Sequence, residues 1–284
     1  MINVLVTGGN GQLASSVKDC INKQVDISFI FTDVDQLDIT DFKAVNTFFK
    51  NKNISYCVNC AAYTAVDNAE TNNEIAEKIN VLGAKNIALA CKAYNAVLIH
   101  ISTDFVFDGA QSNFYTEKDL VNPISVYGST KLKGELAIAE VFKEYYIIRT
   151  SWLYSEHGNN FMKTMLRLGR ERETLNVVVD QIGTPTYALD LAKVILKIIR
   201  EVKTDFGIYN FSNEGVASWY DFAKAIFDES KINVRLYPIK SEAYQTPAKR
   251  PKFSVLDKTK IKETLDIDIP YWKDSLKLAL NNLK

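Results

Sequence analysis

Short apolar runs alternate with helix-length amphipathic segments through the first half of the chain. The apolar runs that we expect to form strands are Ile2–Thr7, Ile27–Thr32, Tyr56–Asn59, Val97–Ser102 and Tyr146–Thr150. The helical segments between them begin near Gly11, Asp41, Asn73 and Tyr127. Continuous apolar strands separated by helices are typical of a parallel sheet that is covered on both faces. The pattern therefore predicts an α/β fold with a doubly wound parallel sheet of the Rossmann type.

The second half of the chain has a less regular rhythm. Its expected elements are helices at Asn160–Arg172, Ala188–Val202, Ser218–Ser230 and Lys273–Leu283, an apolar run at Leu175–Val179 and a strand at Ile208–Phe211. We expect residues 1–151 to form the first domain, with segments around 175–211 returning to it. Residues 152–174 and 212–284 then form a smaller, partly interleaved C-terminal domain over the ligand crevice.

Charge and hydrophobicity narrow the class of protein. Acidic and basic residues balance at 34 each, whereas a nucleic-acid-binding protein normally has a basic excess. No segment approaches the roughly 20 uninterrupted apolar residues of a membrane span, and the first residues do not resemble a signal peptide. We therefore expect a cytoplasmic protein with no nucleic-acid or membrane partner.

Cys57 and Cys60 form a C-x-x-C pair, which is compatible with redox chemistry or half of a zinc site. A zinc site needs two further ligands, and His100 and His157 are the only histidines in the chain. We interpret the two cysteines as small buried residues on and just after a strand. No metal site is predicted.

A glycine-rich turn, residues 7–14, follows the first predicted strand and precedes the first helix. Gly8 and Gly11 allow the backbone to approach a pyrophosphate closely, and the helix that follows points its N-terminus at that charge. A glycine-rich turn is weak evidence alone, but a position between a strand and a helix is the context that a dinucleotide site requires. The turn predicts a site for a dinucleotide such as NADH or NADPH.

Asp33 follows the second predicted strand at the distance from the turn expected for a ribose-binding carboxylate. Such a carboxylate binds the adenosine ribose hydroxyls and repels a 2′-phosphate. Taken alone, Asp33 favours NADH over NADPH. The alternative is that Asp33 is an ordinary turn residue.

Tyr127 and Lys131 lie four residues apart at the start of a predicted helix, on one face. A nearby ammonium is expected to lower the pKa of a phenol, so Tyr127 is a candidate proton donor to a carbonyl oxygen. Ser102 and Thr103 follow the apolar part of the fourth strand, where we expect their hydroxyls to polarise a substrate carbonyl or to hydrogen-bond the phenol. The alternative is that these two residues only terminate the strand.

Several motifs occur together in one order along nearly the whole chain. They are residues 7–13, 59–67, 102–109, 127–135, 149–154 and 180–186, with Lys249-Arg250-Pro251 near the C-terminus. With these motifs the chain resembles the extended short-chain dehydrogenase/reductase superfamily and, within it, the dTDP-4-dehydrorhamnose reductase family. The resemblance implies NADH- or NADPH-dependent reduction of a nucleotide-bound 4-keto-deoxysugar, giving dTDP-L-rhamnose for polysaccharide precursor synthesis.

The resemblance also implies a role for each matched residue. Tyr127 would be the proton donor, Thr103 would tune it, and Lys131 would support both Tyr127 and the nicotinamide ribose. The residues implied to bind the cofactor are Gly8, Gly11, Gln12, Leu13, Asp33, Asp38, Ile39, Ala61, Ala62 and Tyr63, together with Tyr127 and Lys131. Those implied to bind the substrate are Thr103, Asp104, Trp152 and Arg250. Trp152 is equally compatible with a core aromatic, and Arg250 with a surface arginine.

Two departures from the family pattern affect the prediction. Ala14 replaces the third glycine of the turn, which still permits close helix–strand packing. Ser15 and Ser16 stand where some relatives carry acidic metal ligands at a dimer interface. We expect a monomer or a homodimer without a bridging metal.

Other functions remain compatible with some of these motifs. A nucleotide-sugar dehydratase would need a Glu after Thr103-Asp104, where this chain has Phe105. A sugar 4-epimerase or a reductase of another nucleotide-deoxysugar would share Tyr127 and Lys131. A non-catalytic, cofactor-binding subunit such as the regulatory subunit of methionine adenosyltransferase is the alternative from a different class.

Overall fold

Six parallel strands form the central sheet of the computed structural model, which describes residues 2–21 and 26–283. Their spatial order is β10 (Gly207–Phe211), β5 (Tyr145–Thr150), β4 (Val97–Thr103), β3 (Tyr56–Asn59), β1 (Ile2–Thr7) and β2 (Ile27–Thr32). Every neighbouring pair in this sheet runs parallel. The predicted doubly wound α/β fold is confirmed.

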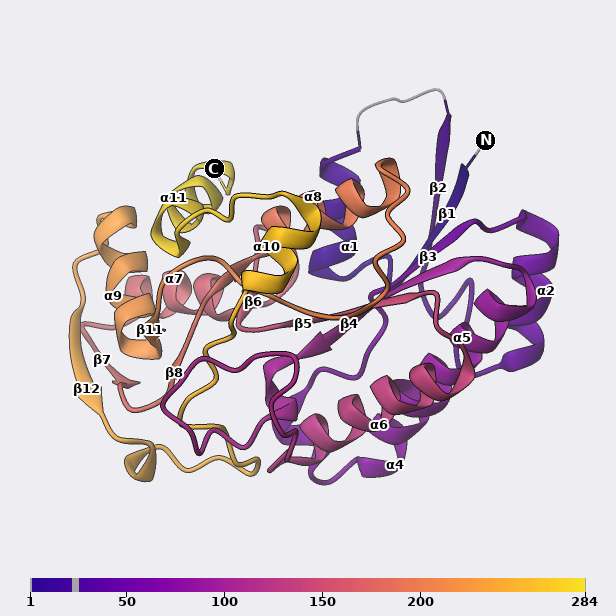
Figure 1. Cartoon of the computed structure of the whole chain (residues 1–284). Helices are drawn as coiled ribbons and strands as arrows, with labels where there is room; N and C mark the ends of the chain where they lie inside the picture. Colours follow the sequence, from indigo (N-terminus) through magenta and orange to yellow (C-terminus); the bar gives the residue numbers. More distant parts are fainter. Residues whose placement is uncertain (1, 22–25, 284) are drawn as a thin grey trace.

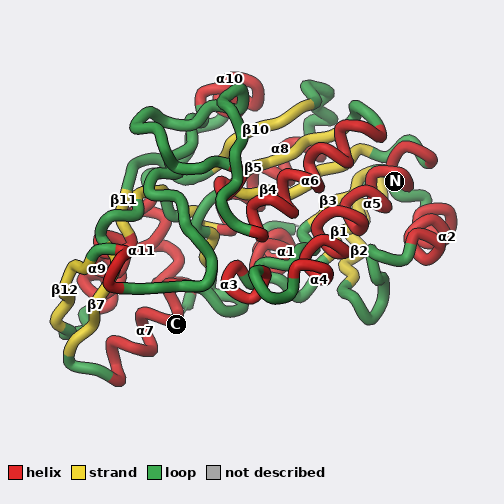
Figure 2. Tube along the Cα trace, turned by 90° about the horizontal axis from the view of Figure 1, so that it is seen from below, coloured by secondary structure: helices red, strands yellow, loops and turns green. Residues whose placement is uncertain are grey.

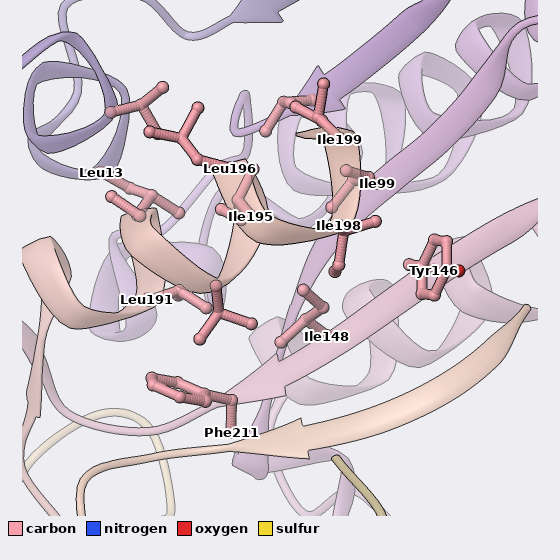
Figure 3. Packing of buried hydrophobic residues seen from close by; sticks show 14 of the residues in the cluster. Leu13, Ile99, Tyr146, Ile148, Leu191, Ile195, Leu196, Ile198, Ile199 and Phe211 are labelled. Atoms are coloured by element: carbon pink, nitrogen blue, oxygen red, sulfur yellow. The ribbon is translucent and has the colours of Figure 1, made fainter. Parts of the chain in front are cut away.

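Helices cover both faces of the sheet (Figure 1). On one face lie α1 (Gln12–Asp19), α8 (Ala188–Arg200) and α10 (Thr259–Leu265), and on the other α2 (Phe42–Lys52), α5 (Ala84–Ala93) and α6 (Val126–Val141). Figure 3 shows the first face, where Leu191, Ile195 and Ile198 of α8 pack against Ile99, Ile148 and Phe211 of the strands. Both faces are thus apolar, which explains why the strands have continuous rather than alternating hydrophobic sequences.

Short elements connect β3 to α5 beside the carboxyl edge of the sheet. They are α3 (Val66–Ala69), α4 (Asn73–Glu77) and a π-helical turn, η1 (Lys78–Gly83). A single π-helical turn inside a helix is an uncommon geometry that frequently occurs at functional sites. This one places Asn80 against the loop that follows β3, because the Asn80 amide hydrogen-bonds the backbone of Tyr63.

A second group of elements packs beside the sheet (Figure 2). Its helices are α7 (Phe161–Glu171), α9 (Trp219–Ser230) and α11 (Trp272–Asn282), which share a core containing Met162, Phe222 and Leu276. Its paired strands are β7 (Thr174–Val178) with β12 (Arg235–Ile239), β6 (Leu153–Tyr154) with β9 (Thr186–Tyr187), and β8 (Ile182–Gly183) with β11 (Ala217–Ser218). No helix in the described part of the chain is both long and apolar enough to cross a membrane.

The chain passes between the two groups more than once. Of the stretch around 175–211, α8 and β10 pack in the sheet domain, whereas β7 pairs with β12 in the second group. Ile261 and Leu265 of α10 return to the core of the sheet domain. The division into 1–151 against 152–174 and 212–284 remains a prediction. The strand β12 and the helix α10 are additions to the elements expected from the sequence.

Candidate active site

A cavity of about 980 Å³ lies at the carboxyl edge of the sheet. Its walls come from the glycine turn, the segments after β2, β3 and β4, the start of α6, and residues 150–153 and 158–160. The carboxyl ends of parallel strands are where open α/β sheets bind their ligands. The cavity therefore brings the predicted catalytic residues together with all of the predicted cofactor residues except Tyr63.

The glycine turn fits a dinucleotide diphosphate. Gly8 has φ +62°, and a Cβ atom on it would lie 2.9 Å from backbone atoms of Ala61. Gly11 is the N-cap of α1 and supplies no side chain to the first N–H groups of that helix, whose first turn has no acidic residue. These N–H groups remain available for an anion, which a helix N-terminus favours.

Asp33 ties the glycine turn to the end of β2. Its carboxylate accepts hydrogen bonds from the backbone N–H of Asn10 (2.9 Å) and of Val34 (2.8 Å). Asp38 and Ile39 line the same end of the cavity. A hydrogen bond from the Thr40 backbone lowers the pKa of Asp38, so this carboxylate is negatively charged at neutral pH.

The loop after β3 contributes Ala61 and Ala62 to the cavity wall. Tyr63 is not among the described residues that line the cavity. Its N–H donates to Asn80 Oδ1 (2.8 Å), and its carbonyl accepts from Asn80 Nδ2 (3.2 Å). Tyr63 therefore anchors the loop through its backbone, and its implied cofactor contact remains a prediction.

Tyr127 lies in the first turn of α6, where Ser125 caps the helix by accepting from Gly128 N–H (3.1 Å). Burial raises the pKa of Tyr127 to about 12, opposed by a hydrogen bond with the Thr103 side chain. The expectation that Lys131 lowers the pKa of this phenol is therefore wrong, because burial outweighs the other influences. A phenol with this pKa is fully protonated at neutral pH, as a proton donor must be.

Lys131 is buried one turn further along α6, with 2% of its surface exposed. Its Nζ donates to the carbonyl oxygen of Ile101 (2.7 Å) and lies 3.3 Å from His100 Nε2. Burial lowers the pKa of Lys131 to about 8, and the nearby Glu135 and Cys60 oppose that shift. Lys131 can thus exchange a proton near neutral pH, which an exposed lysine does not.

Thr103 and Asp104 follow β4 and are both buried. Thr103 Oγ1 donates to Asp104 Oδ1 (3.1 Å) and accepts from the N–H of Phe105 (3.2 Å). Burial raises the pKa of Asp104 to about 6. Asp104 Oδ2 is buried without a hydrogen-bond partner in the described structure, so this cavity-lining carboxyl can receive a hydroxyl hydrogen from a ligand.

Trp152 and Trp219 together line part of the cavity wall. The two indole rings stack with centroids 3.6 Å apart and planes 8° from parallel. Trp152 has φ +46°, a left-handed conformation that is costly for a bulky residue and clusters at binding sites. Trp152 is therefore both packed against the second core and exposed to the cavity.

Arg250 reaches the cavity from the C-terminal segment but already has an ionic partner. Its Nη2 donates to Asp67 Oδ2 (2.7 Å), and its Nη1 donates to Asp67 Oδ1 (3.1 Å). This hydrogen bonding lowers the pKa of Asp67. A contact between Arg250 and a substrate diphosphate remains a prediction, and it would have to compete with Asp67.

The structure brings nearly all the predicted residues to one cavity, and it adds others that sequence reasoning missed. Trp219, Cys60 and Asn160 also line the wall. Trp219 comes from α9, far along the chain, and no motif around it indicates a ligand. Cys57 and Cys91 are fully buried free cysteines, and no group of metal-binding side chains is found in the described residues.

The chain matches the protein-family model described as "RmlD substrate binding domain" over residues 2–284. A curated dTDP-4-dehydrorhamnose reductase from Aggregatibacter actinomycetemcomitans is 41% identical over 287 residues, which cover 98% of each chain. The solved structure of a dTDP-4-dehydrorhamnose reductase from Clostridium acetobutylicum superposes with a TM-score of 0.96 at 45% identity, covering 99% of both chains. A Bacillus anthracis dTDP-4-dehydrorhamnose reductase, solved in complex with NADP, has a TM-score of 0.96 at 38% identity, covering 99% of this chain and 100% of that one.

Proposed function

The chain belongs to the family of dTDP-4-dehydrorhamnose reductases, and on this premise we propose that it is an NAD(P)H-dependent oxidoreductase that reduces dTDP-4-dehydro-6-deoxy-L-mannose to dTDP-L-rhamnose. The observation that carries the proposal is the single cavity that contains the glycine turn, Thr103, Tyr127 and Lys131. In this cavity the glycine turn suits a dinucleotide diphosphate, and the start of α6 presents a protonated phenol. A carbonyl reduction needs these two sites side by side.

The residues of the chain have separate tasks in this reaction. When bound, a reduced nicotinamide supplies the hydride. Tyr127 donates its proton to the oxygen that gains negative charge at sugar C4, and Thr103 holds the phenol in place. Asp104, Trp152 and Trp219 enclose the deoxysugar and exclude water, because Trp152 and Trp219 form a rigid aromatic wall.

The alternative functions have less support. The regulatory-subunit alternative does not require an acid in the cavity, whereas Tyr127, Thr103 and Lys131 are all present and all line it. A dehydratase would need a carboxylate in place of Phe105, whose ring instead packs edge-on against Tyr127 with centroids 5.6 Å apart. We expect the protein to act in the cytoplasm, as a monomer or a homodimer.

The decisive assay follows the oxidation of NADH and of NADPH at the nicotinamide absorbance, with dTDP-4-keto-L-rhamnose generated in the reaction. A matched mixture without the upstream epimerase contains only the 4-keto-D-glucose precursor. We expect rapid oxidation only when the epimerase is present. Equal rates in both mixtures, or no oxidation despite cofactor binding, would refute the substrate assignment.

Asp33 is expected to limit the use of NADPH. Replacing Asp33 with Ser removes a negative charge beside the position of the adenosine ribose, so the ratio of kcat/KM for NADPH to that for NADH should rise about fivefold to tenfold. Steady-state kinetics with each cofactor measure this ratio. Asp35→Ser is the matched control, because Asp35 is exposed and lies outside the cavity wall. An unchanged ratio in the Asp33 variant would show that this carboxylate stabilises the turn and takes no part in the choice of cofactor.

A further inference from the structure

Four buried polar side chains form a hydrogen-bonded chain beneath the cavity. Thr7 Oγ1 donates to Asn59 Oδ1 (2.6 Å), and Asn59 Nδ2 donates to His100 Nδ1 (3.0 Å). His100 Nε2 in turn lies 3.3 Å from Lys131 Nζ. The four residues come from β1, β3, β4 and α6, and none has more than 2% of its surface exposed. This series of hydrogen bonds thus connects β1, the strand that precedes the glycine turn, to Lys131 in the active site.

The orientation of Asn59 assigns one tautomer to His100. Asn59 Oδ1 accepts from Thr7, so its amide nitrogen faces the imidazole and donates to Nδ1. Burial holds the pKa of His100 well below its usual value, so the ring is neutral and carries one hydrogen. Because Nδ1 is the acceptor, this hydrogen is on Nε2. The Nε2–H bond points at Lys131.

We propose that His100 is a positioning residue for Lys131: its imidazole, fixed in one tautomer by Asn59, faces Lys131 beneath the end of β4 and donates a hydrogen bond to the neutral form of its amine. This proposal rests on the proposed function and on the role that the family resemblance implies for Lys131, which is to support the nicotinamide ribose and Tyr127. An N–H group that faces an amine stabilises the free amine, which has a lone pair, and opposes the ammonium, which has only hydrogens. His100 therefore favours proton release from Lys131.

Burial is the main cause of the lowered pKa of Lys131, and the His100 hydrogen bond acts in addition to the other groups around the amine. On α6, Glu135 lies one turn away, but Arg149 of β5 pairs with its carboxylate at 2.7 Å. The Cys60 thiol, after β3, is neutral at physiological pH because burial raises its pKa to about 12. The Ile101 carbonyl accepts from either form and more strongly from the ammonium, so it opposes proton release. Tyr127 on α6 and Asp104 after β4 line the same cavity as Lys131, and the phenol of Tyr127 is neutral.

Replacing His100 with Gln tests the proposal. The amide oxygen of Gln can turn toward Lys131 and accept from its ammonium, which favours the charged form. We expect the alkaline midpoint, at which Lys131 loses its proton, to rise by about one pH unit from its wild-type position near pH 8. Two measurements follow it: NADH affinity against pH by fluorescence titration, and the pH profile of turnover.

Asn59→Asp is the second variant, because His100→Gln could fold poorly. A carboxylate at this position accepts a hydrogen from Nδ1, which moves the lone pair of His100 to Nε2 and lets that nitrogen accept from the ammonium. The alkaline midpoint should again rise. Ile99→Val is the control. Ile99 lies on the same strand as His100 and packs in the core under α8, so its replacement makes a small cavity and leaves the hydrogen-bonded side chains unchanged. Its midpoint should match that of the wild type.

The outcomes separate this proposal from the proposed function. An upward shift in the two variants, with Ile99→Val unchanged, supports a positioning role. A role in packing alone would lower stability and leave every midpoint in place, and that result would overturn the proposal. If the wild type binds NADH but reduces no sugar, the proposed function fails, while the pH dependence of NADH binding still tests His100.

Discussion

Tyr127→Phe is expected to lower turnover by about a hundredfold or more, while the affinity for NADH changes little. The change removes the phenol hydroxyl, which supplies the proton that the substrate oxygen needs in the reaction. The ring of Tyr127 and its edge-on contact with Phe105 remain, so the shape of the cavity is kept. The glycine turn that binds the cofactor diphosphate is a separate element. Steady-state turnover and NADH fluorescence titration measure the two effects.

Tyr115→Phe is the matched control for this substitution. Tyr115 is also buried, and its hydroxyl donates to Asp108 (3.1 Å) away from the cavity wall. This variant should lose some stability and keep its turnover. Turnover near the wild-type value in Tyr127→Phe would remove the phenol from the mechanism. A parallel loss of NADH affinity would instead indicate that the substitution disturbs the cofactor site.

Glu135→Ala is expected to lower the free energy of unfolding by about 3–5 kcal/mol, the usual cost of removing one partner from a buried ion pair. Arg149 and Glu135 have side chains only 3% and 2% exposed. Arg149 Nε donates to both carboxylate oxygens, Nη2 donates to Oε2, and Ser102 Oγ donates to Oε1 (2.5 Å). Without the carboxylate, the guanidinium stays buried and unpaired. Urea unfolding followed by circular dichroism measures the loss.

The double variant Glu135→Leu with Arg149→Met shows whether the loss of stability in Glu135→Ala comes from the buried, unpaired charge of Arg149 or from lost packing. It replaces both charges by apolar groups of similar volume, which is often neutral or stabilising at buried sites. We expect it to be more stable than Glu135→Ala. A loss below about 1 kcal/mol in Glu135→Ala would show that water reaches Arg149 in the variant.

The sheet could be predicted from the sequence because helices cover both of its faces. Each strand is a continuous apolar run, and β1, β2 and β3 have the predicted boundaries. The strand β12 lacks this pattern. Arg235 and Tyr237 are exposed, and Pro238 lies inside the strand. Proline is tolerated because β12 lies at the edge of a two-stranded pair with β7, a position that only the tertiary structure reveals.

The predicted site residues lie where local motifs place them, beside the ends of strands and the start of a helix. Residues that act through distant partners have no such motif. His100 reads as part of an apolar strand, and its role depends on Asn59 and Lys131, which the fold brings together. The pKa of Tyr127 likewise depends on the tertiary structure. Sequence spacing reveals the nearby lysine, but it does not reveal how deeply the phenol is buried.

The position of β10 at the edge of the sheet has a consequence for synthesis of the chain on the ribosome. The first five strands of the sheet are complete once Thr150 has been made, but β10 and α8 come tens of residues later. Until then β5 is an open edge, and Ile99 and Ile148, which α8 later covers, face water. An unpaired strand beside an uncovered apolar face is a typical aggregation hazard. The nascent protein should therefore depend most on chaperones while residues between Thr150 and Phe211 are being synthesised. A ribosome stalled in that interval would present the most aggregation-prone form of the nascent chain.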